Sequence, residues 1–126
     1  MKAFDLASLL ESRAGSADAY LEFIREASMS VGLYVLAAGA VDGQSPHGED
    51  EIYVVMAGRS QFTAGGQTRD IAPGDVLFVA AEAPHRFHDI EEELVLIVIF
   101  APPEGATLRE LEAAYPAVAR MAAHTD

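Results

Sequence analysis

Two histidines and one glutamate in the middle of the chain have the types and the spacing of a metal site. His47 precedes Glu51 by four positions, where the chain enters an extended segment. Even offsets along a strand place side chains on one face, so His47 and Glu51 should share a face. Tyr53 and Val55 continue that face, which we expect to point into the protein interior. A carboxylate in an apolar interior is costly unless it is paired, hydrogen-bonded or bound to a metal, so an inward Glu51 requires a partner. The alternative is that Glu51 faces solvent as part of an acidic loop.

His85 and His88 also lie in segments that border the predicted strands, and they are the candidates for a second imidazole. The chain has no Cys, so any metal must be bound by His and carboxylates. Two imidazoles and one carboxylate with open positions suit divalent iron, with zinc, nickel, manganese or copper as alternatives. His88 has the opposite parity to His85, which points it towards the surface or a supporting role. His124 lies in the polar C-terminal tail and is expected to have no role.

Four further side chains could complete the site. Gln44 or Glu49 could supply a fourth metal ligand, because Glu49 shares the parity of Glu51 and Gln44 lies in a loop where parity constrains little. Tyr53 and Glu49 are the candidate catalytic residues, and the Tyr53 hydroxyl could orient a substrate. Phe87 shares the parity of His85, but ordinary core packing is the favoured interpretation. A metal with an open position can polarise a carbonyl, activate a bound water or bind dioxygen.

Short runs of β-branched and aromatic residues from Met29 to Phe100 predict a closed barrel or sandwich around these side chains. Gly, Pro and Asp separate the runs at regular intervals. Gly65-Gly66 favours a tight hairpin, and Pro73-Gly74 suits a type II turn. The seven predicted strands are Val31–Ala38, Ile52–Met56, Ser60–Ala64, Thr68–Ile71, Val76–Ala80, His85–Asp89 and Leu94–Phe100.

Helical spacing flanks the strand region on both sides. From Phe4 to Ala27, apolar residues predict two short amphipathic helices interrupted at Gly15-Ser16, and Asp18 could cap the second. After Pro102-Pro103, the apolar residues from Leu108 to Met121 predict a C-terminal helix. We therefore expect one domain, with a helical segment at 1–28 packed on the barrel, the barrel at 29–101, and a C-terminal helix and tail at 102–126.

Two segments of the chain resemble the sequence motifs of the cupin family. In QSPHGEDEIYVVMAG, His47, Glu51 and Gly58 match the second His, the Glu and the final Gly of the first motif. In PGDVLFVAAEAPHRFHD, Gly74-Asp75 opens the second motif and His85 takes its ligand position. The resemblance implies a small single-domain cupin, that is, an all-β double-stranded β-helix or jelly-roll barrel, with short helices at both termini.

The chain departs from the cupin pattern at several positions. Ser45 stands where the family has its first His, and serine is a poor metal ligand. Glu82 replaces a common Gly, and Asp89 stands where Asn is usual, although Pro84-His85 is retained. We therefore expect three protein ligands, His47, Glu51 and His85, where the family usually offers four.

Composition excludes several classes of partner. Eight Lys and Arg against twenty Asp and Glu give a formal charge of -12, which repels phosphate backbones and anionic lipid surfaces. The N-terminus carries acidic residues and no uninterrupted apolar stretch, so we expect neither a signal peptide nor a membrane anchor. Nucleic acid and membrane are therefore not expected partners, and a cytoplasmic location is the simplest inference.

Three functions remain open at this point. The first is a metalloenzyme acting on a small polar metabolite, with dioxygenase-like or isomerase-like chemistry among those that the cupin resemblance implies. The second is a non-catalytic barrel that binds or senses a small ligand. The third is a structural protein with a vestigial site. The continuous apolar run LVLIVIF exceeds what one barrel face must bury, which favours a homodimer.

Overall fold

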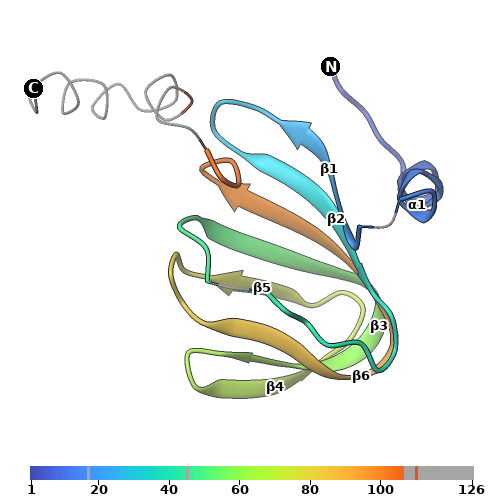
Figure 1. Cartoon of the computed structure of the whole chain (residues 1–126), viewed down its shortest axis with the longest axis vertical. Helices are drawn as coiled ribbons and strands as arrows, with labels where there is room; N and C mark the ends of the chain where they lie inside the picture. Colours follow the sequence, from blue (N-terminus) through green and yellow to red (C-terminus); the bar gives the residue numbers. More distant parts are fainter. Residues whose placement is uncertain (17, 45, 107–109, 111–126) are drawn as a thin grey trace, which may run out of the picture.

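The computed structural model describes residues 1–16, 18–44, 46–106 and 110. Within these residues one α-helix is followed by six β-strands (Figure 1). The predicted all-β jelly-roll class is confirmed. The elements are α1 (Leu6–Ala14), β1 (Tyr20–Arg25), β2 (Ser30–Leu36), β3 (Asp50–Ala64), β4 (Gln67–Ile71), β5 (Val76–Val79) and β6 (His85–Ala101).

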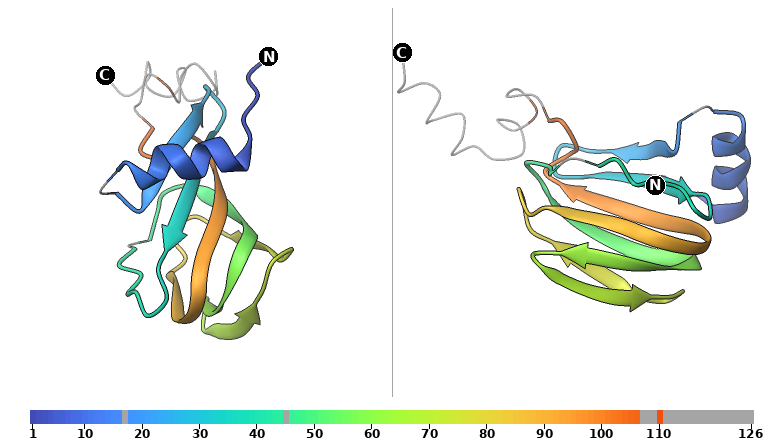
Figure 2. Two further views of the ribbon diagram at one scale, coloured as in Figure 1. Left: turned by 90° about the vertical axis from the view of Figure 1, so that its right-hand side faces the viewer. Right: turned by 60° about the horizontal axis from the view of Figure 1, so that its bottom comes forward.

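The two longest strands, β3 and β6, belong to two layers at once. The first half of β3 pairs with the second half of β6 and with β5, and β2 and β1 extend that layer beyond β6. The second half of β3 pairs with the first half of β6 and with β4. Both strands curve where the halves meet, so the two layers face each other (Figures 1 and 2). The buried aromatic and aliphatic side chains of the main core are Leu36, Tyr53, Val55, Phe62, Ile71, Leu77, Val79, Phe87, Ile90, Leu94, Leu96, Val98 and Phe100.

The bend in β3 depends on a glycine. The pairing register with β6 shifts several times between Val55 and Gln61, as expected where bulges turn a strand. Gly58 has φ +96°, and a Cβ atom there would lie 2.3 Å from the carbonyl oxygen of Glu93. Only glycine fits this approach. Four of the predicted strands therefore combine into two long ones. Ile52–Met56 and Ser60–Ala64 belong to β3, and His85–Asp89 and Leu94–Phe100 belong to β6.

Both predicted turns are present. Gly65 and Gly66 have φ +56° and +78° and join β3 to β4, which is the geometry that paired glycines favour in a hairpin. Gly74 has φ +95°, and the Asp75 amide donates to the Ala72 carbonyl at 3.1 Å, as in a type II turn.

The second predicted N-terminal helix is wrong, because Tyr20–Arg25 forms strand β1, antiparallel to β2. Its register shifts between Glu22 and Ile24, and this bulge adds one residue to the strand. The bulge makes Tyr20, Leu21, Phe23 and Ile24 the partly buried positions, and this spacing imitates a helix. Asp18 therefore caps no helix. The real helix, α1, begins after Asp5, whose carboxylate accepts from the Ser8 amide at 2.9 Å.

A second apolar cluster lies on the outer side of β2 and β6, where α1 crosses the strands (Figure 2). Its buried members are Leu9, Leu33, Val35 and Val95. Helix α1 therefore accounts for part of the apolar run LVLIVIF, whose alternate residues face the main core. The homodimer stays a prediction.

None of the described helices is long and apolar enough to cross a membrane. The predicted C-terminal helix lies almost entirely outside the described residues. Ser45 and His124 also lie outside them.

Candidate metal centre

The structure brings His47, Glu51 and His85 together between the two layers. One potential ligand atom from each residue lies within 4.8 Å of the other two, which forms a group that could hold a metal ion. Glu51 enters from the first layer, where it lies between Val79 of β5 and Phe100 of β6. His85 begins β6 in the second layer. The cluster therefore forms because the two layers face each other.

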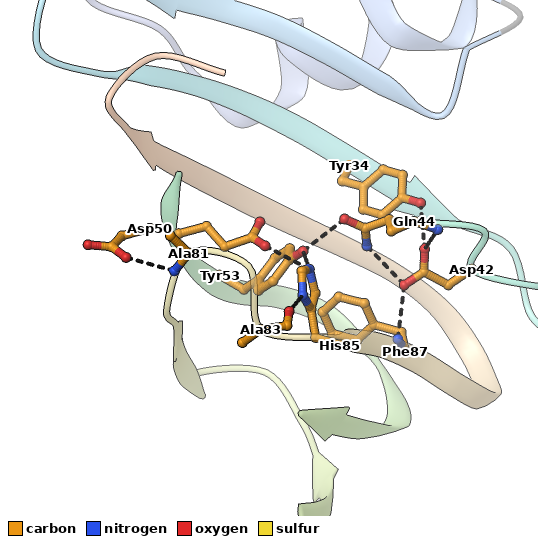
Figure 3. A network of polar contacts seen from close by, with 10 residues as sticks. Tyr34, Asp42, Gln44, Asp50, Tyr53, Ala81, Ala83, His85 and Phe87 are labelled. Carbon is orange, nitrogen blue, oxygen red and sulfur yellow. Dashed lines mark hydrogen bonds and ion pairs between the residues drawn. The ribbon is translucent and has the colours of Figure 1, made fainter. Parts of the chain in front are cut away.

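The loop between β2 and β3 supplies His47 and is tied to the connection between β5 and β6. The His47 carbonyl accepts from the Glu82 amide at 2.6 Å. The Asp50 carboxylate accepts from the Ala81 amide at 2.8 Å (Figure 3). These two contacts, one at His47 itself and one at Asp50, hold the end of the loop against the connection between β5 and β6 and so position His47.

Glu51 and His85 form a buried pair. Their side chains are almost fully buried, and His85 Nε2 lies 2.7 Å from Glu51 Oε1. On the other side of the ring, His85 Nδ1 lies 2.8 Å from the Ala83 carbonyl (Figure 3). A carbonyl can only accept, so Nδ1 carries a proton and Nε2 faces the carboxylate. Burial opposes protonation of the ring, but the contacts with Glu51 and Ala83 outweigh it, and the pKa of His85 lies above its ordinary value.

Two atoms of the cluster lack a partner. His47 Nε2 and Glu51 Oε2 are buried and make no hydrogen bond with any described residue. A buried polar atom without a partner costs roughly 1–3 kcal/mol, and more when the group is charged. Both atoms would be satisfied by one shared metal ion, and imidazole nitrogen and carboxylate oxygen are suitable donors for iron, zinc, nickel or copper. The residues therefore fit a divalent metal.

Tyr53 and Gln44 lie beside His85. The Tyr53 hydroxyl donates to Gln44 Oε1 at 3.0 Å and lies 3.1 Å from His85 Nε2 (Figure 3). Burial and the nearby Glu51 carboxylate raise the pKa of Tyr53, so its phenol is neutral. As predicted, Tyr53 is buried on the Glu51 face of β3. Gln44, one of the two candidates for a fourth ligand, already uses its side-chain oxygen to accept from Tyr53.

Asp42 supports this arrangement, although the sequence alone does not predict it as a site residue. Its carboxylate is buried and accepts from Tyr34 Oη at 3.0 Å, Gln44 Nε2 at 2.9 Å and the Phe87 amide at 2.9 Å. A chain of contacts thus runs from Asp42 through Gln44 and Tyr53 to His85 (Figure 3). Asp followed by Gly is an ordinary turn sequence, so nothing in the pattern distinguishes this Asp from a solvent-exposed one.

We expect Asp42→Asn to destabilise the protein by roughly 2 kcal/mol or more, because the amide NH2 would meet donors that now face a carboxylate oxygen. Chemical denaturation measures the loss. Asp70→Asn, an exposed substitution on β4, should change stability by less than about 0.5 kcal/mol. Equal effects of the two substitutions would contradict a supporting role for Asp42.

The remaining predicted residues lie around the centre. Glu49 Oε1 accepts from the Gly105 amide at 2.7 Å, so Glu49 holds the segment that follows β6. His88 contacts Thr63 Oγ1 and Asp89 Oδ2, each at 2.7 Å, and is outside the cluster, in agreement with its parity. Phe87 packs in the core against the rings of Tyr53 and Phe62, as expected.

A cavity of about 180 Å³ adjoins the centre and is bordered by His47 and Gln44. The sequence does not connect the other lining residues with a site, because Tyr20 lies in a predicted helix and Glu104 follows the last predicted strand. The complete lining is Tyr20, Tyr34, Gln44, His47, Val98, Phe100 and Glu104.

Comparison with known proteins agrees with this architecture. Residues 32–100, more than half of the chain, match the family described as the cupin domain. The chain belongs to the cupin family. An uncharacterized protein of Streptomyces coelicolor, SCO3923, is 50% identical to this cupin over 105 residues, which are 83% of this chain and the whole of that protein.

Solved structures show the same fold at low sequence identity. DMSP lyase DddQ from Ruegeria pomeroyi has a TM-score of 0.62 at 24% identity, over 66% of this cupin and 46% of DddQ. This cupin therefore spans less than half of that chain. KdgF from Halomonas sp. has a TM-score of 0.61 at 21% identity, over 66% of this chain and 76% of KdgF. An RmlC-like cupin from Shewanella frigidimarina has a TM-score of 0.61 at 18% identity, over 66% of this chain and 74% of that chain.

Proposed function

We propose that this cupin is a metal-dependent enzyme that acts on a small polar metabolite at His47, Glu51 and His85. The observation that carries the proposal is the pair of unpartnered buried atoms, His47 Nε2 and Glu51 Oε2, in one cluster. Iron(II) is the favoured metal, because two imidazoles and one carboxylate leave positions open for substrate or dioxygen. When bound, the metal would act as a Lewis acid or as a site for dioxygen.

The protein's own residues would orient the ligands and exclude water. The Ala83 carbonyl fixes the His85 ring with Nε2 towards the centre. Tyr53 could donate its hydroxyl proton to a substrate oxygen in place of Gln44 Oε1, because its phenol stays protonated. Phe62 and Phe87 pack behind Tyr53 and close the interior to water on that side.

Turnover distinguishes the two favoured reaction classes. Iron-loaded protein is mixed with a panel of small carboxylates, phenols and hydroxy-carbonyl compounds, and oxygen uptake is recorded. Uptake that depends on one compound supports a dioxygenase, whereas proton NMR in D2O showing exchange of a C–H next to a carbonyl supports an isomerase. His88→Ala is the control that should keep the activity, and His47→Ala should lose it.

The second candidate is a ligand-binding cupin without turnover. It is supported by Tyr53, whose raised pKa makes it a poor general base near neutral pH, and by Glu49, whose carboxylate is occupied by the Gly105 amide. Saturable binding of a panel compound without oxygen uptake, exchange or product would favour this function.

A further inference from the structure

The cavity beside the metal centre has aromatic walls. Tyr20 lies between two other rings, with centroid distances of 6.3 Å to Tyr34 and 6.3 Å to Phe100. These rings come from the neighbouring strands β1, β2 and β6. The cavity holds about 180 Å³, enough for roughly six water-sized groups. It therefore suits a small ligand or one end of a slightly larger one.

The position of Tyr20 depends on Gly32 of β2, because the Tyr20 ring lies over this glycine. A Cβ atom on residue 32 would lie 2.2–2.3 Å from the Tyr20 ring and hydroxyl, so the absence of a side chain there makes room for the ring. The Tyr20 hydroxyl is buried and makes no hydrogen bond with a described residue. An aromatic ring seated over a glycine, with an unused hydroxyl in the cavity wall, is an arrangement that leaves contacts available for a ligand.

Negative charge dominates the rim of the cavity. The Glu104 carboxylate lines it without a hydrogen bond or ion pair to any described residue. Burial raises the pKa of Glu104, His47 opposes the shift, and the carboxylates of Glu49, Glu22 and Glu51 add to it. Glu104 thus lies in a partly desolvated, acidic setting that a positive charge would relieve.

No Lys or Arg side chain among the described residues lines the cavity. The Arg25 guanidinium donates to the Glu104 carbonyl but also binds the carboxylates of Glu22 and Glu110. The two carboxylates therefore more than neutralise the positive charge of Arg25. Apart from His47 of the metal centre, the lining offers no described side chain that could carry a positive charge and receive an anionic group.

We propose that this cavity binds a positively charged, alkylated group of a small ligand, with Glu104 as the counter-charge and Tyr20, Tyr34 and Phe100 as the aromatic walls. Rings attract cations through their negative faces, and Trp, Tyr and Phe cavities of this kind recognise alkylated ammonium groups. As a substrate subsite this inference rests on the proposed enzyme function, and the substrate then carries its positive group at the end away from the metal. Cation binding itself needs no metal.

Three probes of similar shape and different charge test the proposal: tetramethylammonium, neutral tert-butanol and anionic pivalate. Each is titrated into the full-length protein, as purified and after chelator treatment, and binding is followed by the backbone amide NMR signals of residues around Glu104. We expect saturable binding of tetramethylammonium in both preparations, at least about fivefold tighter than tert-butanol, and no binding of pivalate to the chelator-treated protein.

Glu104→Gln should weaken tetramethylammonium at least about fivefold and leave tert-butanol unchanged, because only the cation uses the charge. Glu11→Gln on exposed α1 is the matched control and should bind like the parent protein. Tyr20→Phe should bind the cation within about twofold, and Tyr20→Leu should weaken it at least about threefold.

Equal binding of the cation and tert-butanol, tight pivalate binding to the chelator-treated protein, or an unchanged Glu104→Gln variant would overturn the cation site. Metal content measured on the same samples separates the two proposals. Cation binding by a protein that binds no metal would refute the metal-dependent enzyme function and support the cation site. Metal binding without a preference for the cation would refute the cation site and leave the enzyme function standing.

Discussion

His85→Ala should abolish stoichiometric metal binding, and His88→Ala, three residues along the same strand, should leave it intact. The His85 ring is buried, its Nε2 faces Glu51, and Ala83 fixes its orientation. His88 instead contacts Thr63 and Asp89 outside the cluster. Loss of a residue that supports a metal ligand lowers metal affinity roughly 10- to 100-fold. Loss of a coordinating residue should cost more, so we expect metal affinity to fall by more than about 100-fold. Metal analysis after purification without chelator, and competition with a chromophoric chelator, measure it.

Glu51→Gln keeps the size of the side chain and removes its charge, and it should reduce metal affinity by a comparable factor. Glu49→Gln and Gln44→Ala test the open fourth position. A loss above about 100-fold in one of them would identify a fourth protein ligand, and losses within about tenfold would leave three. Full metal content in both His85→Ala and His47→Ala would contradict the metal hypothesis, because no other group of His, Asp and Glu among the described residues has suitable geometry.

Strand parity is a local property, and it predicts that Glu51 and His85 point inward, whereas His47 lies in the loop before β3, where parity does not position it. Glu51, Tyr53 and Val55 lie on one buried face of β3, as the alternation indicates. His85 and Phe87 follow the same rule on β6. The hairpin and the type II turn were predictable for a similar reason, since Gly65, Gly66 and Gly74 each adopt the positive φ that their turns require.

The cavity could not be predicted, because it depends on contacts between distant segments. Tyr20 lines the cavity because its segment is strand β1. The bulge in this strand gives its partly buried residues the spacing of a helix, so the sequence predicts the wrong element. Asp42 supports the centre through a backbone amide 45 residues away, that of Phe87. Gly58 is a motif position, but its approach to Glu93 becomes visible only when β3 and β6 are paired. Local pattern thus predicts which residues face inward, and pairing decides which of them meet.

Metal affinity should rise steeply with pH, because the metal must displace the proton that His85 shares with Glu51. The pKa of His85 in the metal-free protein lies above its ordinary value of about 6.5. Protonation of His85 therefore stabilises the metal-free fold fully below about pH 6.5, and this contribution is lost as the pH rises through the raised pKa. Metal binding has the opposite dependence, since only the deprotonated Nε2 can coordinate.

We expect affinity to fall about tenfold for each pH unit below the raised pKa of His85. Chelator competition between pH 8 and pH 5.5, corrected for the chelator's own protonation, gives the slope. Calorimetry in buffers of different ionisation enthalpy gives the number of protons released, which should be close to one just below that pKa. An affinity that stays constant over this range, with no proton release, would mean that the Glu51 and His85 pair persists and that the metal binds elsewhere.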